Sequence, residues 1–287
     1  MADMVNYYAF AGLEFSVSTP DERMYGGDHI LSLFRTKHVE NPHNFTISLV
    51  EQLTPPTGKL VASTDNFAAY WDGDTRLRYT GVKNNDFTNA YMRACHQGKT
   101  HVVELKSSVY HNGTTANSIL NAVELEHLIT EVNGFVFHSS FIDIGGKGIL
   151  FTAPSGTGKS TQADLWHDLR GARILNGDRS AVRSTKDGVV ACGIPFMGSS
   201  QYCENVTLPL AGIVYLTQSP QTTIRQLRGA EAFRRVWEGI SVNTWDKDDM
   251  NKIMDTVSQL ITNIPVWHLS CTPDESAVVA LAQQLGK

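Results

Sequence analysis

Hydrophobic and polar positions follow two different patterns along the chain, and the change comes near residue 112. In the first part, short runs of apolar, β-branched and aromatic residues are separated by clusters of Pro, Gly, Asn and Asp, a pattern typical of strands joined by turns. These runs cover residues 7–17, 30–34, 45–50, 67–71 and 102–105. We therefore predict a β-rich N-terminal domain over residues 1–112.

One turn in this part predicts a hairpin. Asp72, Gly73 and Asp74 separate two aromatic-rich segments, and an Asp-Gly pair favours the tight turn of a β-hairpin. Calcium binding by the two carboxylates is the alternative interpretation, but the local sequence offers too few further oxygen ligands for that ion.

The second part alternates strands with helices after the polar segment 111–115. Apolar residues recur at helical spacing over 116–131, 230–239 and 246–261, whereas short apolar runs predict strands at 135–137, 141–144, 148–151, 173–176, 189–192, 212–216 and 266–269. Thr272, Pro273 and Glu275 form the start signal of a C-terminal helix. This order predicts an α/β domain over residues 113–287.

The most informative motif of the chain lies at residues 151–161, Phe-Thr-Ala-Pro-Ser-Gly-Thr-Gly-Lys-Ser-Thr. A short apolar strand precedes it and a helical pattern follows it, which is the context that a phosphate-binding P-loop requires. Ala153 takes the position of the usual first glycine. The alternative is a Gly/Ser turn that contains Lys-Ser by chance, and the flanking strand and helix argue against it.

The motif suggests roles for its residues. Small residues allow the backbone N–H groups to turn toward phosphate oxygens, Lys159 reaches the terminal phosphates, and the hydroxyl of Ser160 ligates Mg²⁺. The expected nucleotide-binding residues are Ser155, Gly156, Thr157, Gly158, Lys159, Ser160 and Thr161. The cofactors expected at such a site are ATP and Mg²⁺.

Phosphoryl transfer needs an acidic residue to help hold the metal, and Asp178 is the candidate. It follows the predicted strand 173–176, the next strand after the motif's helix, where a parallel sheet brings a side chain to its carboxyl edge. Arg179 comes next and is a candidate clamp for transition-state charge. The alternative is a solvated turn residue, because Asn176 and Gly177 form a strong turn signal.

Two further residues are candidates on weaker grounds. His138 lies among aromatic residues, before the strand that leads to the motif, and an isolated histidine there is more often a packing residue. Glu204 lies in the polar segment 198–205, for which a surface loop is the simpler interpretation. Cys203 has no neighbouring cation to activate it, so we predict no nucleophile there.

Composition and charge exclude several classes of function. The 287 residues include 24 Lys and Arg against 29 Asp and Glu, and the net charge of −5 gives no electrostatic support for nucleic-acid binding. No apolar run approaches the ~18 residues of a membrane span, and the first residues lack the pattern of a secretory signal. The 4 cysteines form no CxxC pair, so reduced thiols in the cytoplasm are expected. His29, His38 and His43 lack the spacing of a zinc site.

Together, the segments around the motif resemble the HPr kinase/phosphorylase family, P-loop proteins related to phosphoenolpyruvate carboxykinase. The resemblance covers about residues 115–287. It rests on His138-Ser139, on the turn 145–148 with the strand that follows, and on Ser-Gly-Thr-Gly-Lys-Ser at 155–160, in the family's order and spacing. It implies a P-loop kinase domain of the HPr kinase/phosphoenolpyruvate carboxykinase type, preceded here by the β-rich domain. Serine kinases that tailor ribosomal peptides are similar in segments 159–166 and 192–198.

The resemblance also implies catalytic roles. His138 becomes a phosphate-side residue, and Asp178 combines metal binding with the role of base toward the acceptor hydroxyl. The family has two adjacent acids where this chain has Gly177 and Asp178. Asp178 therefore serves both roles alone, or Glu204 or His138 assists it, or catalysis is weak.

We expect an ATP-dependent kinase that phosphorylates a hydroxyl group, on serine or threonine of a peptide or protein or on a small molecule. Its catalytic residues are Lys159, Asp178 and His138, with Arg179 and Glu204 as further candidates. The alternative is a nucleotide-binding sensor or a kinase homologue with reduced catalysis, because an acid of the family is missing. Carboxykinase chemistry on an oxo-acid is disfavoured by the chain length and the metal-ligand set.

The expected partners are a nucleotide and one hydroxyl acceptor, with neither nucleic acid nor a membrane among them. A homo-oligomer is compatible with the sequence. The HPr protein is not expected as the substrate, because the family's recognition segment is not evident at 195–209.

Overall fold

A computed structural model of the chain describes residues 4–20, 29–83, 86–110, 122–196, 198 and 201–286. The chain divides into two compact units, Met1–Leu125 and Glu126–Lys287. The boundary expected between residues 112 and 113 lies outside the described residues.

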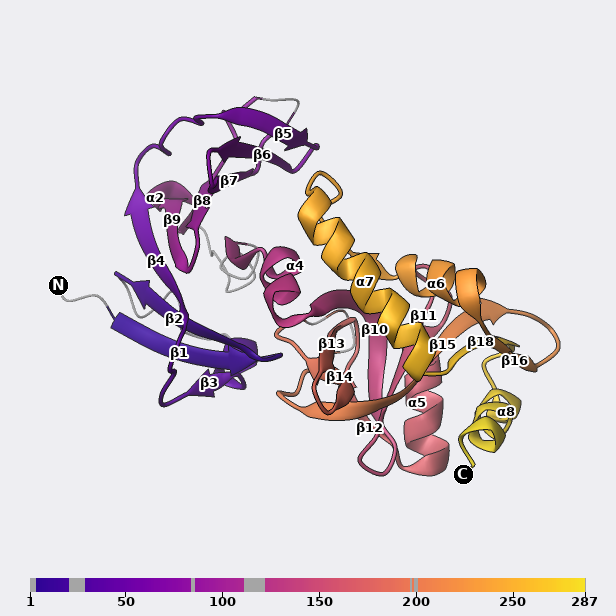
Figure 1. The fold of residues 1–287 in the computed structure, drawn as a ribbon. Coiled ribbons are helices and arrows are strands. Elements are labelled where there is room, and N and C mark those ends of the chain that lie inside the picture. The colour runs from indigo at the N-terminus through magenta and orange to yellow at the C-terminus, as the bar shows by residue number, and fades with distance from the viewer. Residues whose placement is uncertain are drawn as a thin grey trace. The chain divides into compact units, whose positions relative to one another are not determined.

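The first unit is built around one nine-stranded sheet, drawn from indigo to purple in Figure 1. Its strand order is β3-β1-β2-β4-β9-β8-β7-β6-β5, in which β4 lies parallel to β2 and β9 and the other neighbours are antiparallel. The elements are β1 (Met4–Phe10), β2 (Leu13–Thr19), α1 (His29–Ser32), β3 (Arg35–Thr36), β4 (His43–Val50), β5 (Lys59–Ser63), β6 (Phe67–Asp72), β7 (Thr75–Thr80), β8 (Met92–Gln97), β9 (Thr100–Lys106) and α2 (Ser107–Tyr110).

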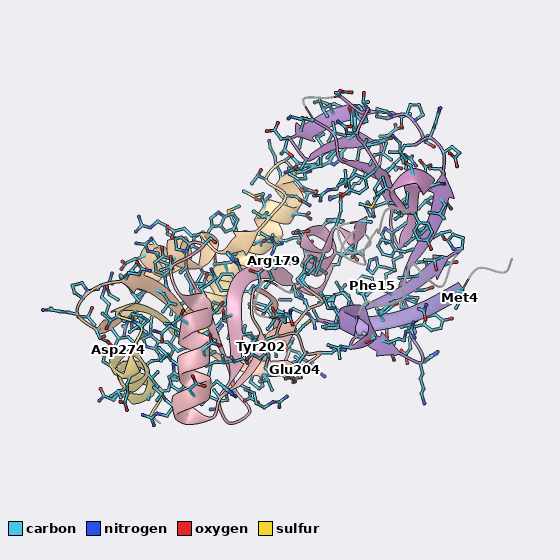
Figure 2. The ribbon with its side chains drawn as sticks, turned by 180° about the vertical axis from the view of Figure 1, so that it is seen from behind. Met4, Phe15, Arg179, Tyr202, Glu204 and Asp274 are labelled. Carbon is cyan, nitrogen blue, oxygen red and sulfur yellow. The ribbon has the colours of Figure 1, made fainter. Side chains whose placement is uncertain are left out.

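Alternation of buried and partly exposed side chains explains these strands. On β2 every second residue is buried, and Phe15 from this set packs against Phe10 and Phe45 at ring-centroid distances of 4.7 and 6.3 Å (Figure 2). The predicted hairpin at residues 72–74 is confirmed, because β6 and β7 pair antiparallel with Asp72 opposite Thr75.

Two predictions for this unit were wrong in detail. The run 7–17 is two strands, because Ala11 and Gly12 adopt φ values of 49° and 73° and reverse the chain. The run 30–34 contains the short helix α1 instead of a strand. Its buried residues, Leu31 and Phe34, are three positions apart, which matches a helical turn and not the alternation of a strand.

The second unit holds the remaining elements, drawn from magenta to yellow in Figure 1. They are α4 (Leu125–Leu128, which begins at the unit boundary), η2 (Ile129–Val132), β10 (Gly134–Asp143), β11 (Gly148–Thr152), α5 (Lys159–Arg170), β12 (Arg173–Asn176), β13 (Arg179–Thr185), β14 (Gly188–Gly193), β15 (Thr207–Gln218), β16 (Thr223–Leu227), α6 (Gly229–Trp237), β17 (Ile240–Ser241), α7 (Lys247–Asn263), β18 (Val266–Cys271) and α8 (Glu275–Leu285). The fold is therefore mixed α/β, with one large sheet in each unit.

Two long strands organise this second sheet. The first half of β10 pairs with β13, and its second half lies between β11 and β12. The first residues of β15 pair with β14, and the rest of β15 lies parallel to β11 and β18. Helices α6 and α7 pack on one face of the sheet through one hydrophobic cluster, and α5 and α8 pack on the other face through a second cluster.

The predicted alternation of helix and strand is only partly present in this unit. Residues 135–144 were predicted as two strands and form the single strand β10, and the strands β13 and β16 were not predicted. The helix predicted over 116–131 is interrupted at Glu124, whose φ is 48°, and residues 111–121 lie outside the described part. Among the described residues, no helix combines the length and the apolar character that crossing a membrane requires.

Candidate functional site

The motif at residues 151–161 forms the end of β11, a loop, and the start of α5. Gly156 and Gly158 have φ values of 77° and 114°, a backbone conformation that side chains disfavour, so the loop requires glycine at both positions. Gly158 caps α5 and its carbonyl accepts a hydrogen bond from the N–H of Gln162 at 2.9 Å. The loop therefore leads directly into the N-terminus of a 12-residue helix, where unpaired N–H groups favour anions.

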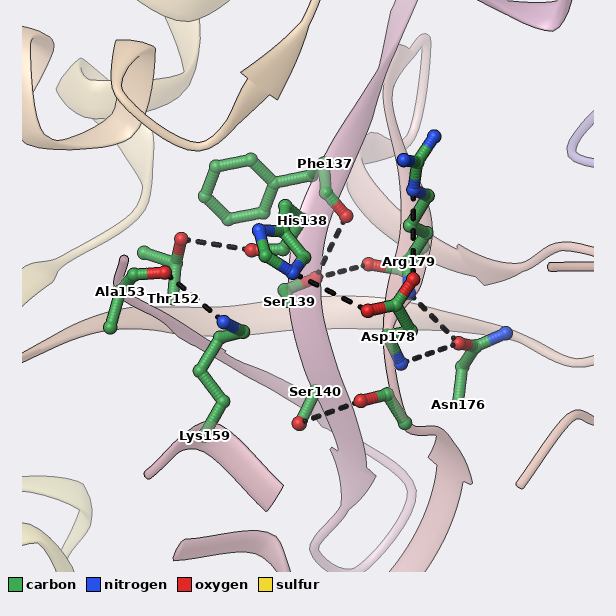
Figure 3. Close-up of polar contacts among 12 residues, drawn as sticks. Phe137, His138, Ser139, Ser140, Thr152, Ala153, Lys159, Asn176, Asp178 and Arg179 are labelled. Carbon is green, nitrogen blue, oxygen red and sulfur yellow. Dashed lines mark hydrogen bonds and ion pairs between the residues drawn. The ribbon is translucent and has the colours of Figure 1, made fainter. Parts of the chain in front are cut away.

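Lys159 is the first residue of α5, and its side chain turns back into the loop. Its ammonium donates to the carbonyl of Ala153 at 3.1 Å, and the residue is only 8% exposed. Burial lowers the pKa of Lys159 from its ordinary value, and the negative charge of Asp178 opposes this effect. The charge of Asp178 therefore acts on Lys159, and Figure 3 shows both side chains near β10.

The order of strands brings Asp178 to this site. β11 and β12 lie on opposite sides of β10 and both run antiparallel to it, so their carboxyl ends meet at the same edge. Asp178 follows β12 and stays attached to β10, because its carbonyl accepts from the N–H of Ser139 at 3.0 Å. The expected position at a carboxyl edge is present, although β10 separates the two parallel strands.

His138 precedes β11, the strand that leads to the motif, as predicted, but it lies inside β10 and not between two strands. Its Nε2 is 3.4 Å from the Asp178 Oδ1, and both side chains are about one-third exposed. This hydrogen bond from His138 is the largest cause of a lowered pKa at Asp178. Desolvation opposes it, while the charges of His138, Arg179 and Lys159 add to it. Asp178 is thus held as a carboxylate that still reaches solvent.

Arg179 extends the cluster on the other side of Asp178. Its Nε lies 3.6 Å from the Asp178 Oδ2, and its Nη1 lies 3.8 Å from the Glu126 carboxylate. The guanidinium also lies over the ring of Phe196 at 5.7 Å. With 37% of its side chain exposed, Arg179 keeps donors available for an anionic ligand.

Asn176 is a residue of this site that sequence analysis treated only as part of a turn. Its fully buried side chain accepts from the N–H groups of Asp178 and Arg179 at 3.2 and 3.1 Å, and donates to the carbonyl of Ile194 at 2.9 Å. Asn176 therefore fixes the backbone that presents both charged residues. The Asn-Gly signal was present, but its long-range partner at Ile194 could not be inferred.

Two glycines close to Asp178 matter for different reasons. A Cβ at Gly198 would lie 2.7 Å from the Cβ of Asp178, so this position needs glycine for close approach. Gly177 is not among the glycines with positive φ, and its N–H donates to the carbonyl of Tyr202 at 3.3 Å. The backbone at Gly177 therefore does not by itself exclude a side chain.

Of the remaining predicted site residues, those of the loop lie at the site and Glu204 does not. Ser155, Gly156, Ser160 and Thr161 are exposed on the loop and the first turn of α5. Glu204 is directed elsewhere: its carboxylate pairs with Arg173 at 2.6 Å, at the start of β12, whereas Asp178 follows the end of that strand. The structure does not bring Glu204 together with the other candidates, and Figure 2 shows it beside Tyr202 on the segment before β15.

The donor set suits a magnesium ion. The Asp178 carboxylate is 34% exposed, and its ion pairs with His138 and Arg179 are as long as 3.4 and 3.6 Å, so its oxygens keep lone pairs for a ligand. The exposed hydroxyl of Ser160 stands at the start of α5. A carboxylate, a hydroxyl and waters are the oxygen ligands that Mg²⁺ prefers.

A pocket of about 590 Å³ opens beside the loop. It lies between the first turn of α5 and the segments that follow β15 and β18. Its lining residues are Gly156, Thr157, Gly158, Thr161, Gln162, Leu216, Thr217, Gln218, Ser219, Pro220, Cys271, Thr272 and Pro273. The loop is tied to one wall, because the side-chain amide of Gln218 donates to the carbonyl of Thr157 at 3.4 Å.

Comparisons with known proteins find similarity among solved structures and none in sequence. No protein-family profile matches the chain, and no curated protein matches it in sequence. Among solved structures, the Hpr(Ser) kinase/phosphatase from Coxiella burnetii is similar with a TM-score of 0.31 and 12% sequence identity, over 53% of this chain and 97% of that chain.

Proposed function

We propose that the chain is an ATP-dependent phosphotransferase of the HPr-kinase-like type, which phosphorylates a hydroxyl group of a peptide, protein or small molecule. The observation that carries the proposal is the meeting of two features at one sheet edge. A glycine-rich loop with an inward lysine stands at the end of β11, and an Asp–His pair lies beside the end of β12.

Each residue of the cluster has a chemical task. Lys159 and the N–H groups of the loop and of α5 neutralise the β- and γ-phosphates. Asp178 accepts the proton of the acceptor hydroxyl. The hydroxyl oxygen then bonds to the γ-phosphorus, while the bond from that phosphorus to the bridging oxygen of the leaving ADP breaks. His138 donates to the Asp178 carboxylate or to a phosphate oxygen, and Arg179 balances charge on the transferred group.

Mg²⁺ would supply positive charge that offsets the negative charge developing on the phosphate oxygens. Ser160 and Asp178 are the residues that would hold it. The lowered pKa of Asp178 supports the metal-binding role, because the carboxylate is ionised at neutral pH.

The test combines binding with transfer. Wild-type protein and Asp178→Asn are titrated with Mg²⁺-ATP by calorimetry and then incubated with γ-labelled ATP and an array of Ser/Thr peptides. We expect both proteins to bind, the variant more weakly, and transfer by the variant to fall by about 10² or more, the usual scale for a lost general base.

A matched control is Asp187→Asn, an exposed carboxylate in the turn between β13 and β14, which should leave binding and transfer unchanged. Absence of binding by the wild-type protein with ATP and with GTP in millimolar excess would remove the nucleotide site. Wild-type rates in Asp178→Asn would remove Asp178 from the mechanism.

One observation favours a second candidate, a nucleotide-binding sensor or reduced kinase: the residue before Asp178 is Gly177, so Asp178 has no acid next to it in the sequence on that side. Since Gly177 lacks a positive φ, Gly177→Asp tests this candidate without forcing the backbone. A rise in transfer with a second carboxylate supports a reduced kinase. Loss of transfer in this variant, with ATP binding retained, supports an intact one-carboxylate kinase.

A further inference from the structure

The first unit contains a cavity of about 380 Å³, which we call the aromatic pocket. Its lining consists of Tyr79, Phe87 and Ala90, of the segment 51–56 that follows β4, and of Lys106 at the end of β9. All of these residues belong to the first unit. The volume lies near the lower limit of small-molecule sites, roughly 300–1,000 Å³, so the pocket suits a small ligand.

Much of the surface of the aromatic pocket is apolar. Tyr79 and Ala90 are each 1% exposed, and the ring of Phe87 stands edge-on to that of Tyr79 at a centroid distance of 5.1 Å. One leucine and two prolines of segment 51–56 add further apolar surface. Phe87 is only half-buried, and aromatic rings favour edge-to-face or offset contacts with a further ring. A flat aromatic group therefore fits this surface.

Hydrogen bonds fix the segment 51–56 beside the aromatic rings. The Tyr79 hydroxyl donates to the carbonyl of Thr54 at 2.8 Å and accepts from the Arg93 Nε at 3.1 Å. The Glu104 carboxylate accepts from the N–H and the hydroxyl of Thr54 at 2.8 and 2.7 Å, and it pairs with Arg93 at 3.0 Å. The pocket is therefore formed before a ligand binds, which lowers the entropic cost of binding.

Two opposite charges complete the lining of the aromatic pocket. Glu51 and Lys106 lie on neighbouring segments, because β4 and β9 are parallel and Val50 pairs with Lys106. Within the described part of the chain, neither of the two side chains forms an ion pair or a hydrogen bond. A carboxylate and an ammonium beside an apolar surface are complementary to a ligand that has an ammonium, a carboxylate and an apolar group.

We infer that the aromatic pocket binds a free amino acid with an aromatic side chain. The ring of the ligand contacts Tyr79 and Phe87, its α-ammonium pairs with Glu51, and its α-carboxylate pairs with Lys106. An amino acid carries both charges on one carbon atom, which matches two charged side chains from adjacent segments. This site lies in the first unit and does not depend on the function proposed for the loop of the second unit.

The test uses L-phenylalanine and compounds that each lack one part of it. L-alanine lacks the ring, L-phenylalaninamide lacks the carboxylate, and N-acetyl-L-phenylalanine lacks the ammonium. L-leucine replaces the ring by an aliphatic group. Binding to the full chain is detected by saturation-transfer NMR and measured by calorimetry. The variants are Lys106→Met and Glu51→Gln, and the matched controls are Lys37→Met and Glu40→Gln, which change exposed side chains outside the pocket.

We expect each charged group of the ligand to respond to one variant. Lys106→Met should weaken the binding of L-phenylalanine about fivefold, the scale of a partly exposed ion pair, and leave that of L-phenylalaninamide unchanged. Glu51→Gln should have the same effect on L-phenylalanine and none on N-acetyl-L-phenylalanine. The wild-type protein and both controls should bind L-phenylalanine more tightly than L-leucine, and at least about tenfold more tightly than L-alanine.

Three results would overturn this inference. They are absence of L-phenylalanine binding at millimolar concentration, equal affinity for L-leucine and L-phenylalanine, and an unchanged affinity for L-phenylalanine in both Lys106→Met and Glu51→Gln. Binding of Mg²⁺-ATP is measured in the same samples and should be equal in all of them. A failure of ATP binding would contradict the proposed function and leave the amino-acid site standing.

Discussion

Each of the two units has a cluster of polar side chains on its sheet, and the clusters differ in what their members contact. In the first unit, His43, His96 and His101 lie on β4, β8 and β9 with at most 5% of each residue exposed. His101 joins the other two, with Nε2 at 3.1 Å from the His43 Nδ1 and Nδ1 at 2.8 Å from the His96 Nδ1. The ring of Phe45 stacks on His101 at 4.2 Å.

In the second unit, the polar side chains follow strand ends and remain partly exposed. His138 and Asp178 form a pair at 3.4 Å with a third of each side chain in solvent, beside a loop and a helix N-terminus. The same residue type thus has two roles: a histidine enclosed by imidazoles and a phenyl ring stabilises a sheet, and one at a sheet edge is available to a ligand. The two kinds of histidine differ in their exposure to solvent and not in the chemistry of the side chain.

The largest effect is expected from removal of Lys159, which should reduce the stabilisation by Mg²⁺-ATP in the second unit and leave the first unit unchanged. At 100 times its dissociation constant, Mg²⁺-ATP adds about 2.7 kcal/mol to the stability of the protein that binds it. Lys159→Ala should abolish most of this gain, because the ammonium is the cation inside the loop. Region-resolved hydrogen exchange with and without Mg²⁺-ATP measures it.

The matched control is Lys147→Ala, which removes an equal charge from the exposed turn between β10 and β11. It should retain the full protection by Mg²⁺-ATP. Equal protection in Lys159→Ala would contradict the role of the loop lysine.

A change in the histidine cluster should have the opposite result: it should destabilise the first unit and leave the binding of Mg²⁺-ATP unchanged. His101→Phe keeps the ring and its stacking but removes the nitrogens that contact both other histidines, and buried polar groups left without a partner cost about 1–3 kcal/mol each. Exchange should accelerate in β4, β8 and β9, while the gain from Mg²⁺-ATP stays at the wild-type value. The exposed His38→Phe serves as control; loss of ATP binding in His101→Phe alone would refute the assignment of the cluster to structure.

The contact between His138 and Asp178 should affect how the affinity for Mg²⁺-ATP depends on pH. The pKa of Asp178 is lowered from the ordinary 3.8, so the carboxylate is charged above that value. It loses this charge, and the interactions that depend on it, as the pH falls through the lower pKa of the folded protein. His138→Ala removes the largest cause of the shift, so the acid limb of Mg²⁺-ATP affinity against pH should move to higher pH. Arg179→Gln should give a smaller move in the same direction, and no move in either variant would exclude the contact in solution.

The smallest effect is expected for Glu204. Its ion pair with Arg173 joins side chains that are 41% and 59% exposed, and exposed pairs contribute about 0–1 kcal/mol. Glu204→Gln should therefore change the melting temperature little and leave ATP binding and transfer intact. A drop in transfer comparable to that of Asp178→Asn would place Glu204 in the mechanism against the geometry described above.

Local patterns in the sequence were sufficient for the elements that carry the loop. The strand predicted at 148–151 and the helical pattern predicted after the motif correspond to β11 and α5, because both depend on neighbours within a few residues. For the same reason Lys159 and Asp178 could be proposed as partners from strand order alone. Misassigned segments, such as 30–34, are short runs in which helix and strand spacing both fit.

Only the tertiary structure decided which distant residues meet. His138 and Asp178 are 40 positions apart and contact each other because β10 and β13 pair in a register that sets His138 opposite Arg179. The pocket needs the ends of β15 and β18 beside α5, and Glu204 is drawn away by Arg173. Such contacts depend on strand register and packing across the whole sheet, which residue spacing along the chain does not encode.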